Sequence, residues 1–570
     1  MSVNFVPNQI IVLKFGGSVL RDVASLRGAV HEIYRWRRHG VKVVAVVSAL
    51  AGETDRLLSL CERVCEDVSG YAKAGVAAIG ELTSAGLLGV QLERAGIPAC
   101  VITPAAASLV ATGDPFDSTP VRVNARVIHE ALDRDGVVVF PGFVAVDEQA
   151  RLVLLGRGGS DLSALFLAAE LGNTRCRLIK DVDGLYERDP AGAHPPPPRF
   201  DYATWDDALR TDGSIIQYKA TTFAKSRGLA FELGAINSEH VTHIGPGPTR
   251  VVAGSSRPAP RTVALLGAGV VGGGVFELLS QWPSFVRVVA AAVTNPAKHS
   301  LPGVQLSTDP LAVASRGCDI VIEAMGGIDG PRAAITRALE GGSHVITANK
   351  AVIAAHGAEL HALAKRRGLR LLHSAAVGGS TTVLEAIASR PGTRLTRVRG
   401  ILNGTTNFVL NRLVQGDTLA AAVKEAQHRG FAEADPSRDL GGIDALDKLR
   451  VIALAAGLGE IREPKLETLN DAALARLASR DPRANLRHVA SLDATGPNLI
   501  ASVQLQALQA PDPLFDIPGA KNAVQLEWSD GHTHTLHGSG AGRWPTSESV
   551  VGDVFELLRH TPANAAEAAA

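Results

Sequence analysis

The segment Thr262–Leu279, TVALLGAGVVGGGVFELL, decides the fold class of the second half of this 570-residue chain. An apolar run of strand length leads into the pattern G-x-G-x-x-G, and an apolar stretch of helical length follows. Glycines at such a turn let backbone N–H groups approach a pyrophosphate at the N-terminus of the helix. We therefore predict a Rossmann domain with a dinucleotide site. The residues predicted to hold the dinucleotide are Gly267, Gly269, Val270, Val271 and Gly272.

The next predicted strand indicates which dinucleotide is bound. This strand, Val286–Val293, ends in Thr294 and Asn295 rather than in an acidic residue. An acidic side chain at this place would bind the ribose of NAD and repel a 2′-phosphate. Its absence, with Lys298 close by, favours NADP or the use of both coenzymes, and Thr294 is predicted to border the coenzyme.

Further along the chain, Gly430–Lys448 reads GFAEADPSRDLGGIDALDK and concentrates acidic residues before a lysine. We predict a helix over Ile443–Leu458, on which Asp444 and Lys448 share a face. A lone pair of this kind is usually a solvated ion pair at the surface. The dinucleotide motif upstream and the sequence TANK at Thr347–Lys350 favour an active site instead, in which acidic groups hold an α-amino group and a lysine protonates an alkoxide.

The first half of the chain shows strands alternating with helices. A short apolar strand, Ile10–Phe15, runs into KFGGS, and later strands end in the motifs GRGGSD at Gly156–Asp161 and DVDGLY at Asp181–Tyr186. This alternation predicts a parallel-rich sheet with helices on both faces and with ligands at the carboxyl ends of the strands.

The motifs KFGGS, VSA, GE, FPGF, GRGGSD and DVDGLYERDP, in this order, resemble the aspartate kinase catalytic domain of the amino acid kinase family, up to about Asp189. The resemblance implies ATP as the phosphoryl donor, with Mg²⁺ carried mainly by its phosphates. It also assigns roles to individual residues. The transferred phosphoryl group would be held by Lys14, Gly16, Gly17 and Ser18, the substrate by Glu81, Arg157 and Ser160, and the ATP by Asp181, Asp183, Gly184 and Tyr186, while Asp161 would orient the site.

Two features depart from that family. Where the family has a lysine on the nucleotide side, an ungapped alignment places Ile215, and Lys219 could substitute at a different spacing. The family's paired regulatory ACT domains have no room before the linker that starts near Gly245. Two alternatives to an aspartate kinase therefore stay open. The first half is either a catalytically silent module that binds a ligand or forms a dimer, or a kinase for another small carboxylate.

The second half resembles homoserine dehydrogenase through TANK, HSAAVGG at His373–Gly379, GILNGTTN at Gly400–Asn407 and the acidic segment before Lys448. The resemblance implies reduction of aspartate semialdehyde to homoserine. It also implies the site residues. Lys350 and Lys448 would flank the substrate carbonyl, Glu433, Asp439 and Asp444 would hold the substrate amino group and Lys448, and Thr347 and Asn349 would border the nicotinamide.

The same resemblance concerns a structural monovalent cation. The family usually places a glutamate where this chain has Ser374. Only backbone ligands near Val377 would then remain, which predicts a weak cation site at best.

The predicted fold class is α/β, with an amino acid kinase fold joined to a Rossmann domain and an α+β catalytic and dimerisation domain. The predicted boundaries are 1–245 for the kinase-like domain, 246–261 for the linker, 262–385 for the Rossmann domain, 386–540 for the catalytic domain, 541–560 for a helix returning to the Rossmann domain, and 561–570 for a frayed tail. From the family resemblance we expect a homo-oligomer.

Composition restricts the function classes. Hydrophobic residues make up 46% of the chain and charged residues 20%, and the formal net charge is +0. A neutral, ordinary globular balance gives no reason to expect nucleic acid or an anionic membrane as a partner. The five cysteines form no C-x-x-C pair, and we see no signal peptide and no apolar stretch of about 18 residues. The expected setting is the cytoplasm, and the expected substrates are small molecules.

Overall fold

The computed structural model describes residues 9–65, 67–190, 197–210, 215–253, 259–478 and 485–560. The chain divides into two compact units, which are described separately below. The first unit comprises Met1–Arg94 and Pro98–Arg257, and the second comprises Ala95–Ile97 and Pro258–Ala570. The predicted tail at 561–570 and part of the predicted linker, residues 254–258, lie outside the described residues.

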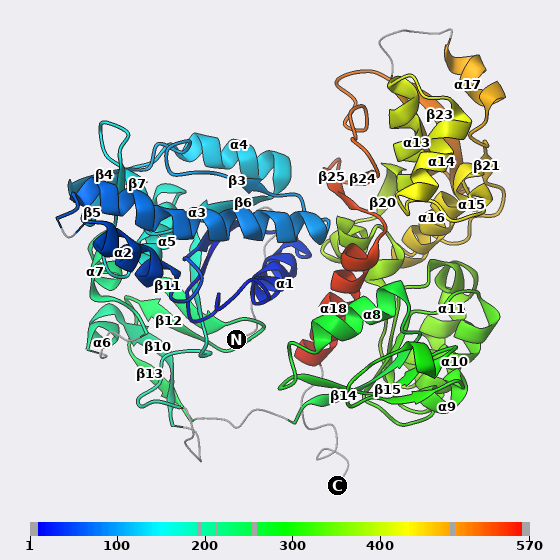
Figure 1. Cartoon of the computed structure of the whole chain (residues 1–570). Helices are drawn as coiled ribbons and strands as arrows, with labels where there is room; N and C mark the ends of the chain where they lie inside the picture. The colour runs from blue at the N-terminus through cyan, green and yellow to red at the C-terminus, as the bar shows by residue number, and fades with distance from the viewer. Residues whose placement is uncertain are drawn as a thin grey trace. The chain divides into compact units, whose positions relative to one another are not determined.

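The first unit is built on a sheet whose central strands are parallel (Figure 1). Its strands in spatial order are β13 (Arg250–Val252), β10 (Arg199–Thr204), β12 (Val241–Gly245), β11 (Phe231–Ala235), β9 (Arg175–Lys180), β1 (Ile10–Phe15), β2 (Lys42–Val47), β6 (Val137–Pro141) and β3 (Cys100–Val101). The central strands β1, β2 and β6 are largely apolar because helices cover both faces of the sheet. A smaller sheet has the order β5 (Asp117–Arg122), β4 (Val110–Asp114), β7 (Val144–Val146) and β8 (Leu152–Leu154).

The helices of this unit are α1 (Leu26–Arg37), α2 (Glu53–Val64), α3 (Gly70–Arg94), α4 (Ala125–Asp135), α5 (Gly159–Glu170), α6 (Trp205–Leu209) and α7 (Tyr218–Arg227). Helix α5 packs on β1 and β9 and carries Asp161 in its first turn. Helix α3 starts at Gly70, well before the apolar stretch Leu82–Leu92, because small and apolar residues continue its buried face toward the N-terminus.

Helix α3 is also the one helix in the described part of the chain that is long and apolar enough to cross a membrane by length and composition. The expectation that no such stretch exists was therefore wrong. Ala74, Ala77 and Ala78 of α3 pack against Val144 and Leu154 of the small sheet. These contacts give the helix a place in the core of the unit, where an apolar composition is normal.

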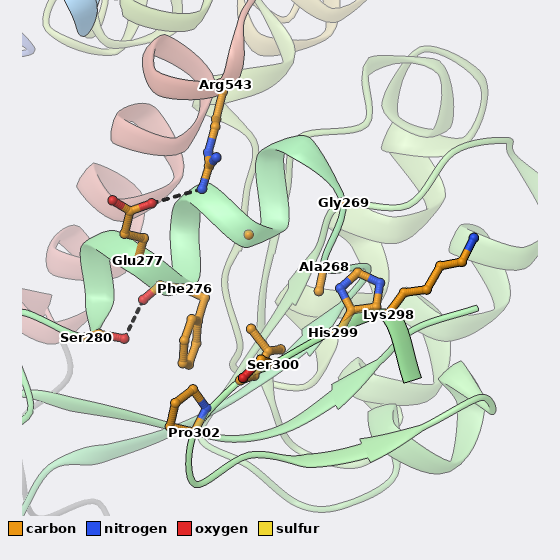
Figure 2. A pocket seen from close by; sticks show the side chains of 12 residues that line it. Ala268, Gly269, Phe276, Glu277, Ser280, Lys298, His299, Ser300, Pro302 and Arg543 are labelled. Carbon is orange, nitrogen blue, oxygen red and sulfur yellow. Dashed lines mark hydrogen bonds and ion pairs between the residues drawn. The ribbon is translucent and has the colours of Figure 1, made fainter. Parts of the chain in front are cut away.

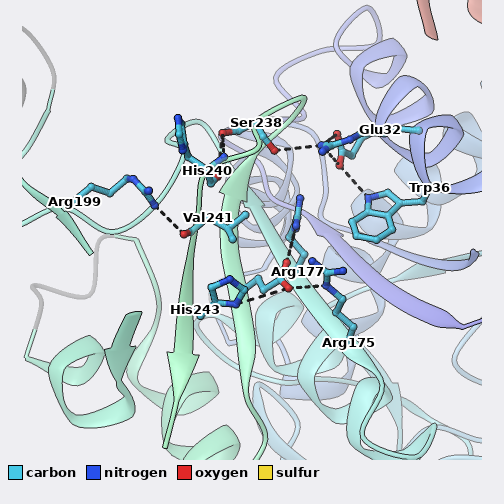
Figure 3. A network of polar contacts seen from close by, with 11 residues as sticks. Glu32, Trp36, Arg175, Arg177, Arg199, Ser238, His240, Val241 and His243 are labelled. Atoms are coloured by element: carbon cyan, nitrogen blue, oxygen red, sulfur yellow. Dashed lines mark hydrogen bonds and ion pairs between the residues drawn. The ribbon is translucent and has the colours of Figure 1, made fainter. Parts of the chain in front are cut away.

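A buried network of charges fixes one end of the central strands (Figure 3). Glu232 on β11 accepts hydrogen bonds from Arg175 Nε at 2.6 Å and Arg177 Nε at 2.8 Å, both on β9. Glu32 on α1 accepts from Trp36 Nε1 at 3.0 Å. Buried charges are tolerated when they are paired in this way. The network braces β9 against β11 at the end opposite Lys180, the last residue of β9.

The second unit begins with a parallel sheet of Rossmann type, whose spatial order is β16 (Gln305–Ser307), β15 (Val286–Ala292), β14 (Arg261–Leu266), β17 (Ile320–Glu323), β18 (His344–Thr347) and β19 (Leu371–Leu372). Its helices are α8 (Val270–Leu279), α9 (Pro310–Ala314), α10 (Asp329–Glu340) and α11 (Lys350–Arg366), with the short 3-10 turn η1 (Pro296–Lys298). The last helix, α18 (Arg543–His560), packs along α8, and Figure 1 shows the two side by side.

The rest of the second unit holds a mostly antiparallel sheet, whose spatial order is β21 (Lys465–Leu466), β23 (Ile500–Leu508), β22 (Asn485–Asp493), β20 (Leu395–Ile401), β24 (Lys521–Trp528) and β25 (Thr533–Ser539). The remaining elements are η2 (Ser374–Ala376), η3 (Gly379–Thr381), α12 (Val383–Ala388), α13 (Gly404–Val414), α14 (Leu419–His428), α15 (Ser437–Leu440), α16 (Ile443–Ala455) and α17 (Asp471–Ala478). Helix α16 packs against α11, which brings the acidic segment to the Rossmann sheet. The predicted α/β fold class is confirmed.

Candidate functional site

The glycine turn after β14 has the geometry that a dinucleotide needs. Gly267 has a φ of +93°, in the region that favours glycine, and a Cβ there would lie 2.7 Å from the carbonyl oxygen of Ala324. A Cβ on Gly272 would lie 1.9 Å from the carbonyl oxygen of Gly267. Around Gly269, which precedes the first residue of α8, the space is open. The unpaired N–H groups of the first helical turn therefore face room for a pyrophosphate.

A cavity of about 780 Å³ lies beside this turn (Figure 2). Residues of α8, the segment after β15 and α18 line it. Lys298, His299 and Ser300 come from the segment after β15, and Arg543 comes from α18, where its guanidinium donates to Glu277 at 2.9 Å. Basic and hydroxyl groups after the second strand are suited to a phosphate on the adenosine ribose. Thr294 is exposed just before this segment.

A buried carboxylate connects two neighbouring strand ends in the same sheet. Glu323 ends β17, where it accepts hydrogen bonds from the Thr347 hydroxyl and, at 2.7 Å, from the Met325 backbone N–H. Asn349 caps α11 and donates to the carbonyl oxygen of Gly327 at 2.9 Å. Burial raises the pKa of Glu323 to about 7. Thr347 and Asn349, predicted to border the nicotinamide, are thus held in place by Glu323 and the loop after it.

Two lysines and one carboxylate meet where α11 packs on α16. Asp444 lies between Lys350 Nζ, at 3.0 Å, and Lys448 Nζ, at 2.8 Å. Lys448 is buried and also donates to the Leu402 carbonyl oxygen, whereas the Lys350 side chain is 36% exposed. Burial alone would oppose ionisation of Asp444, but the two ammonium groups outweigh it and lower the pKa of Asp444. Asp444 in turn raises the pKa of Lys350, so this lysine keeps its charge.

The acidic residues around this cluster are not equivalent. Asn403, the N-cap of α13, donates to Asp439 at 2.7 Å and to Asp444 at 2.9 Å. Burial raises the pKa of Asp439, which is half-buried beside the lysines. Glu433 is exposed, and its backbone carbonyl accepts from Gln427. The structure therefore groups Asp439 with Asp444 and the lysines and leaves the Glu433 carboxylate at the surface.

A second lysine–carboxylate cluster lies in the first unit, next to a cavity of about 360 Å³. Asp161, in the first turn of α5, lies 2.6 Å from Lys14 Nζ and 3.0 Å from Lys180 Nζ. Lys14 and Asp161 are almost fully buried, and the Lys180 side chain is 12% exposed. Burial lowers the pKa of Lys14 to about 8, although Asp161 opposes this shift. For Asp161 burial is again outweighed by the two lysines, so its pKa is lowered.

Glu81 of α3 faces the same cavity. Burial raises its pKa to about 7, and backbone N–H groups and Lys14 only partly offset this. One of its carboxylate oxygens, Oε2, is buried and has no hydrogen-bond partner among the described residues. An unpartnered buried oxygen is costly unless a ligand supplies a donor, as a substrate ammonium would.

Comparison with known proteins assigns both units. Family models match residues 9–229 as amino acid kinase family, residues 267–374 as homoserine dehydrogenase, NAD binding domain, and residues 383–555 as homoserine dehydrogenase. The homoserine dehydrogenase of Synechocystis sp. is 33% identical over 315 residues, which are 52% of this chain and 73% of that protein. The chain belongs to the homoserine dehydrogenase family.

Two further relatives support this assignment. The NAD(+)-dependent homoserine dehydrogenase of Pseudomonas canavaninivorans is 36% identical over 278 residues, covering 46% of this chain and 77% of that protein. A crystal structure of a homoserine dehydrogenase from Thiobacillus denitrificans superposes with a TM-score of 0.50 and 31% identity, covering 54% of this chain and 75% of that one. In this chain the homoserine dehydrogenase region follows an amino acid kinase domain, as predicted.

In the homoserine dehydrogenase region, Ser374 stands where the family has a glutamate, so it brings no carboxylate to the cation site. Its hydroxyl and backbone N–H donate to the Asp553 carboxylate of α18, at 2.7 Å and 3.0 Å. Val377, the predicted backbone ligand, is buried nearby in sequence. Within the described ranges, no group of three or more histidine, cysteine or acidic side chains is arranged to hold a metal ion.

In the kinase domain, some predicted residues meet and others do not. Those that line the cavity are Lys14, Gly17, Glu81, Arg157, Ser160 and Asp161. Those outside its lining are Gly16, Ser18, Asp181, Asp183, Gly184 and Tyr186, and the Tyr186 hydroxyl donates to Asp183 at 2.6 Å. The suggestion that Lys219 replaces a lysine at Ile215 is wrong, because Lys219 is held by the Asp117 carboxylate and the carbonyl oxygens of Ser118 and Leu155.

Sequence reasoning missed three side chains at the two sites, namely Lys180, Glu323 and Asn403. Lys180 and Glu323 each end a buried parallel strand, and Asn403 follows β20 as a helix cap. A charged residue at the carboxyl end of an apolar strand was the signal available for the first two. Asn403 lies in the motif GILNGTTN, but neither the motif nor its place as an N-cap indicated a contact with Asp439 and Asp444.

Proposed function

We propose that this chain carries two active sites, which act on aspartate and on aspartate semialdehyde in the biosynthesis of threonine, methionine and lysine. The kinase site would phosphorylate the side-chain carboxylate of aspartate with ATP. The dehydrogenase site would interconvert aspartate semialdehyde and homoserine with a nicotinamide coenzyme. The observation that carries the dehydrogenase assignment is the placing of Asp444 between Lys350 and Lys448, next to Asp439.

The dehydrogenase cluster suits reduction of an aldehyde. The nicotinamide, when bound, supplies the hydride. The chain must stabilise the negative oxygen that results and give it a proton. Lys448 uses hydrogen bonds to Asp444 and the Leu402 carbonyl, which leaves it one N–H for the substrate oxygen. We assign proton donation to Lys448 and a second positive charge at the oxygen to Lys350. Asp439, and Glu433 from the surface loop, would hold the substrate ammonium.

The kinase cavity suits a small amino acid. Arg157 can grip a carboxylate through two N–H groups, with Ser160 beside it, and the unpartnered oxygen of Glu81 can accept from an ammonium. The side-chain carboxylate of the substrate attacks the γ-phosphorus, and the bond to the leaving β-phosphate oxygen breaks. Lys14 remains an ammonium throughout and balances charge on the transferred group. We expect Mg²⁺ to enter on the phosphates of ATP, with Gly16, Ser18 and the Asp181–Tyr186 segment bordering the nucleotide.

The remaining assignments are also proposals. NADP is favoured over NAD because Lys298, His299 and Ser300 follow β15 where an acidic side chain would repel a 2′-phosphate. A cytoplasmic homo-oligomer without nucleic acid or membrane partners follows from the family resemblance and the neutral charge. A monovalent cation is not needed for either reaction as written.

Ile215 stands where the amino acid kinase family has a lysine. This difference favours the second candidate function, a dehydrogenase that carries a catalytically silent kinase fold. The amino acid kinase match over residues 9–229 and the intact pairing of Lys14 with Asp161 favour two active sites instead.

The two candidates are separated by assaying purified full-length protein for aspartyl phosphate, trapped as the hydroxamate, with Lys14→Ala as control. Homoserine-dependent reduction of NADP⁺ is measured in the same samples. We expect hydroxamate from the wild type and none above background from the variant, with the dehydrogenase rate equal in both. Wild-type protein that reduces NADP⁺ but makes no hydroxamate would refute the kinase proposal.

A further inference from the structure

Asp161 in the kinase domain binds a lysine that neither the family resemblance nor the comparisons assign. Lys14 already lies 2.6 Å from this carboxylate, and Lys180 lies 3.0 Å from its other oxygen. One ammonium is enough to neutralise one carboxylate. A second ammonium in the same buried place carries a desolvation cost that the pairing with Lys14 leaves largely uncompensated. The two lysines and Asp161 together carry one net positive charge. The Glu81 carboxylate faces the same cavity but is assigned above to a substrate ammonium, which leaves this charge for an anion.

The sheet register places the two lysines side by side. Strands β1 and β9 are parallel neighbours, and Lys14 lies opposite Leu178. Side chains two residues apart on a strand point to the same face, so Lys180 shares the face of Leu178 and of Lys14. Helix α5 covers this face and brings Asp161 between the two ammonium groups. The arrangement is thus set by the sheet and one helix rather than by a flexible loop.

Lys180 also has the right position along the sheet edge. It lines the cavity together with Arg157 and Glu81, the groups proposed to bind the amino acid. The residue after it, Asp181, opens the segment proposed to border ATP. A group at this junction lies where the phosphoryl group passes from nucleotide to acceptor. The Lys180 side chain is 12% exposed and is part of the cavity lining.

We propose that Lys180 is a catalytic residue of the kinase site, where its ammonium contacts the phosphoryl group in transfer and supplies the positive charge that Ile215 cannot. The proposal rests on the kinase function proposed above. In the step, an oxygen of the acceptor carboxylate forms a bond to the γ-phosphorus while the bond to the oxygen of the β-phosphate breaks. Lys180 gives up no proton, and its charge offsets the negative charge on the oxygens in transit.

Ile215 and Lys219 make the assignment specific to this chain. Ile215 lines the cavity with an apolar side chain, and Lys219 is turned away into contacts with Asp117, Ser118 and Leu155. Among the described lining residues, Lys14, Arg157 and Lys180 carry the positive charges. In the proposed function, Arg157 binds the substrate carboxylate. Lys14 and Lys180 are then the cations that remain for the phosphates.

The test compares Lys180→Met, Lys180→Arg and the matched control Lys225→Met in the full-length protein. Lys225 lies on α7, is exposed and pairs with Asp206 at 2.6 Å. Formation of hydroxamate from ATP and L-aspartate is measured over a range of both substrates, and thermal unfolding is recorded for each variant. We expect kcat to fall about 100-fold or more in Lys180→Met, because one transition-state donor of this kind is worth about that much. Lys180→Arg, which keeps the charge, should retain about tenfold more activity than Lys180→Met.

The outcomes separate the two proposals. A wild-type protein without hydroxamate would refute the kinase function and this inference with it. An active wild type that loses activity in Lys14→Ala but not in Lys180→Met would leave the kinase function standing and overturn the role of Lys180. Equal losses in Lys180→Met and Lys180→Arg, at unchanged unfolding temperature, would also overturn it, because the role assigned here depends on charge. A change confined to KM for aspartate would do the same.

Discussion

The two units of this chain each hold a carboxylate between two lysines, but the clusters are built and tuned differently. In the kinase domain, Lys14 and Lys180 end neighbouring parallel strands and Asp161 begins a helix. In the dehydrogenase region, Asp444 and Lys448 lie one turn apart on α16 and Lys350 begins α11. At Lys14, burial outweighs the attraction of Asp161 and lowers the pKa to about 8. At Lys350, the attraction of Asp444 outweighs burial and raises the pKa.

This difference follows from how deeply the lysine side chains are buried. Lys14 of the kinase domain is closed in, and the removal of water from around its ammonium lowers its pKa. Lys350 is more exposed, and Asp444, with smaller contributions from Asp447 and Asp439, raises its pKa and keeps it charged. In the proposed functions, the same three groups serve as a receptor for phosphate in one cluster and as a permanent cation beside a carbonyl in the other, according to how much water they retain.

The largest expected effect separates the lysines of the dehydrogenase. We expect Lys448→Met to lower kcat for homoserine oxidation about 1000-fold, and Lys350→Met about 100-fold, because proton transfer and charge stabilisation are lost together in the first and only the charge in the second. Initial rates at saturating substrate measure both. The exposed Lys424→Met on α14 is the control. A larger loss in Lys350→Met than in Lys448→Met would contradict these assignments and indicate that Lys350 donates the proton.

The pH dependence should differ between the two activities. Glu81 must be ionised to bind an ammonium, so kinase activity rises with pH through about 7, and Lys14 must stay protonated, so activity falls as pH rises through about 8. Between pH 7.5 and 9.5 we expect kinase kcat/KM to fall about tenfold or more.

The raised pKa of Lys350 predicts no such loss for homoserine oxidation over the same range. Rate profiles of both activities in one buffer series test this, and Glu81→Gln should remove the acidic limb of the kinase profile. Parallel alkaline losses in the two activities would contradict the difference in tuning.

A smaller effect concerns the coenzyme. Replacing Lys298 by alanine should lower kcat/KM for NADP⁺ about tenfold and change that for NAD⁺ less than about twofold, because the lysine would pair only with the 2′-phosphate. Lys365→Ala, at the far end of α11, is the matched control. Equal effects on both coenzymes would show that Lys298 does not read the 2′-phosphate.

The smallest effect is expected at Glu323. The Met325 N–H and the Thr347 hydroxyl bind different oxygens of Glu323, and a glutamine has an acceptor oxygen at only one of these two places, so the nicotinamide border should loosen. We expect Glu323→Gln to lower kcat/KM for the coenzyme about fivefold at pH 8.5, where the wild-type carboxylate is ionised, and less than about twofold at pH 6, where it is protonated. The exposed Glu359→Gln serves as control. A loss that does not change with pH would contradict a role for the ionised form.

Much of the fold and of the two candidate sites could be predicted from the sequence, because strands, glycine turns and short motifs depend on local sequence. The turn after β14 and the pairing of Asp444 with Lys448 depend only on neighbours in the chain. The boundaries were less predictable. The stretch Ile97–Ile102 has the length and composition of a strand, yet only Cys100–Val101 pairs with β6, because pairing depends on a distant partner.

Two of the missed residues, Lys180 and Glu323, were missed for the same reason. Lys180 and Lys14 are brought together by the order of strands, and Glu323 reaches Thr347 across two parallel strands. Neither juxtaposition leaves a spacing in the sequence. The error at Lys219 has the same origin, since its partner Asp117 lies on a hairpin far away in the chain. Glu433 shows the opposite limit of sequence reasoning. Its motif places the residue near the site but does not determine where its side chain lies, and in the structure Glu433 is exposed.

The measurement that most directly tests the central claim is a comparison of Asp161→Asn and Asp444→Asn in the full-length protein, with both activities assayed on the same samples. Each substitution removes the carboxylate from one cluster and leaves the other intact. We predict that Asp161→Asn lowers hydroxamate formation about 100-fold or more and leaves NADP⁺ reduction within about twofold, and that Asp444→Asn does the reverse. Loss of both activities in either variant, or full retention of the activity assigned to the altered cluster, would contradict the account.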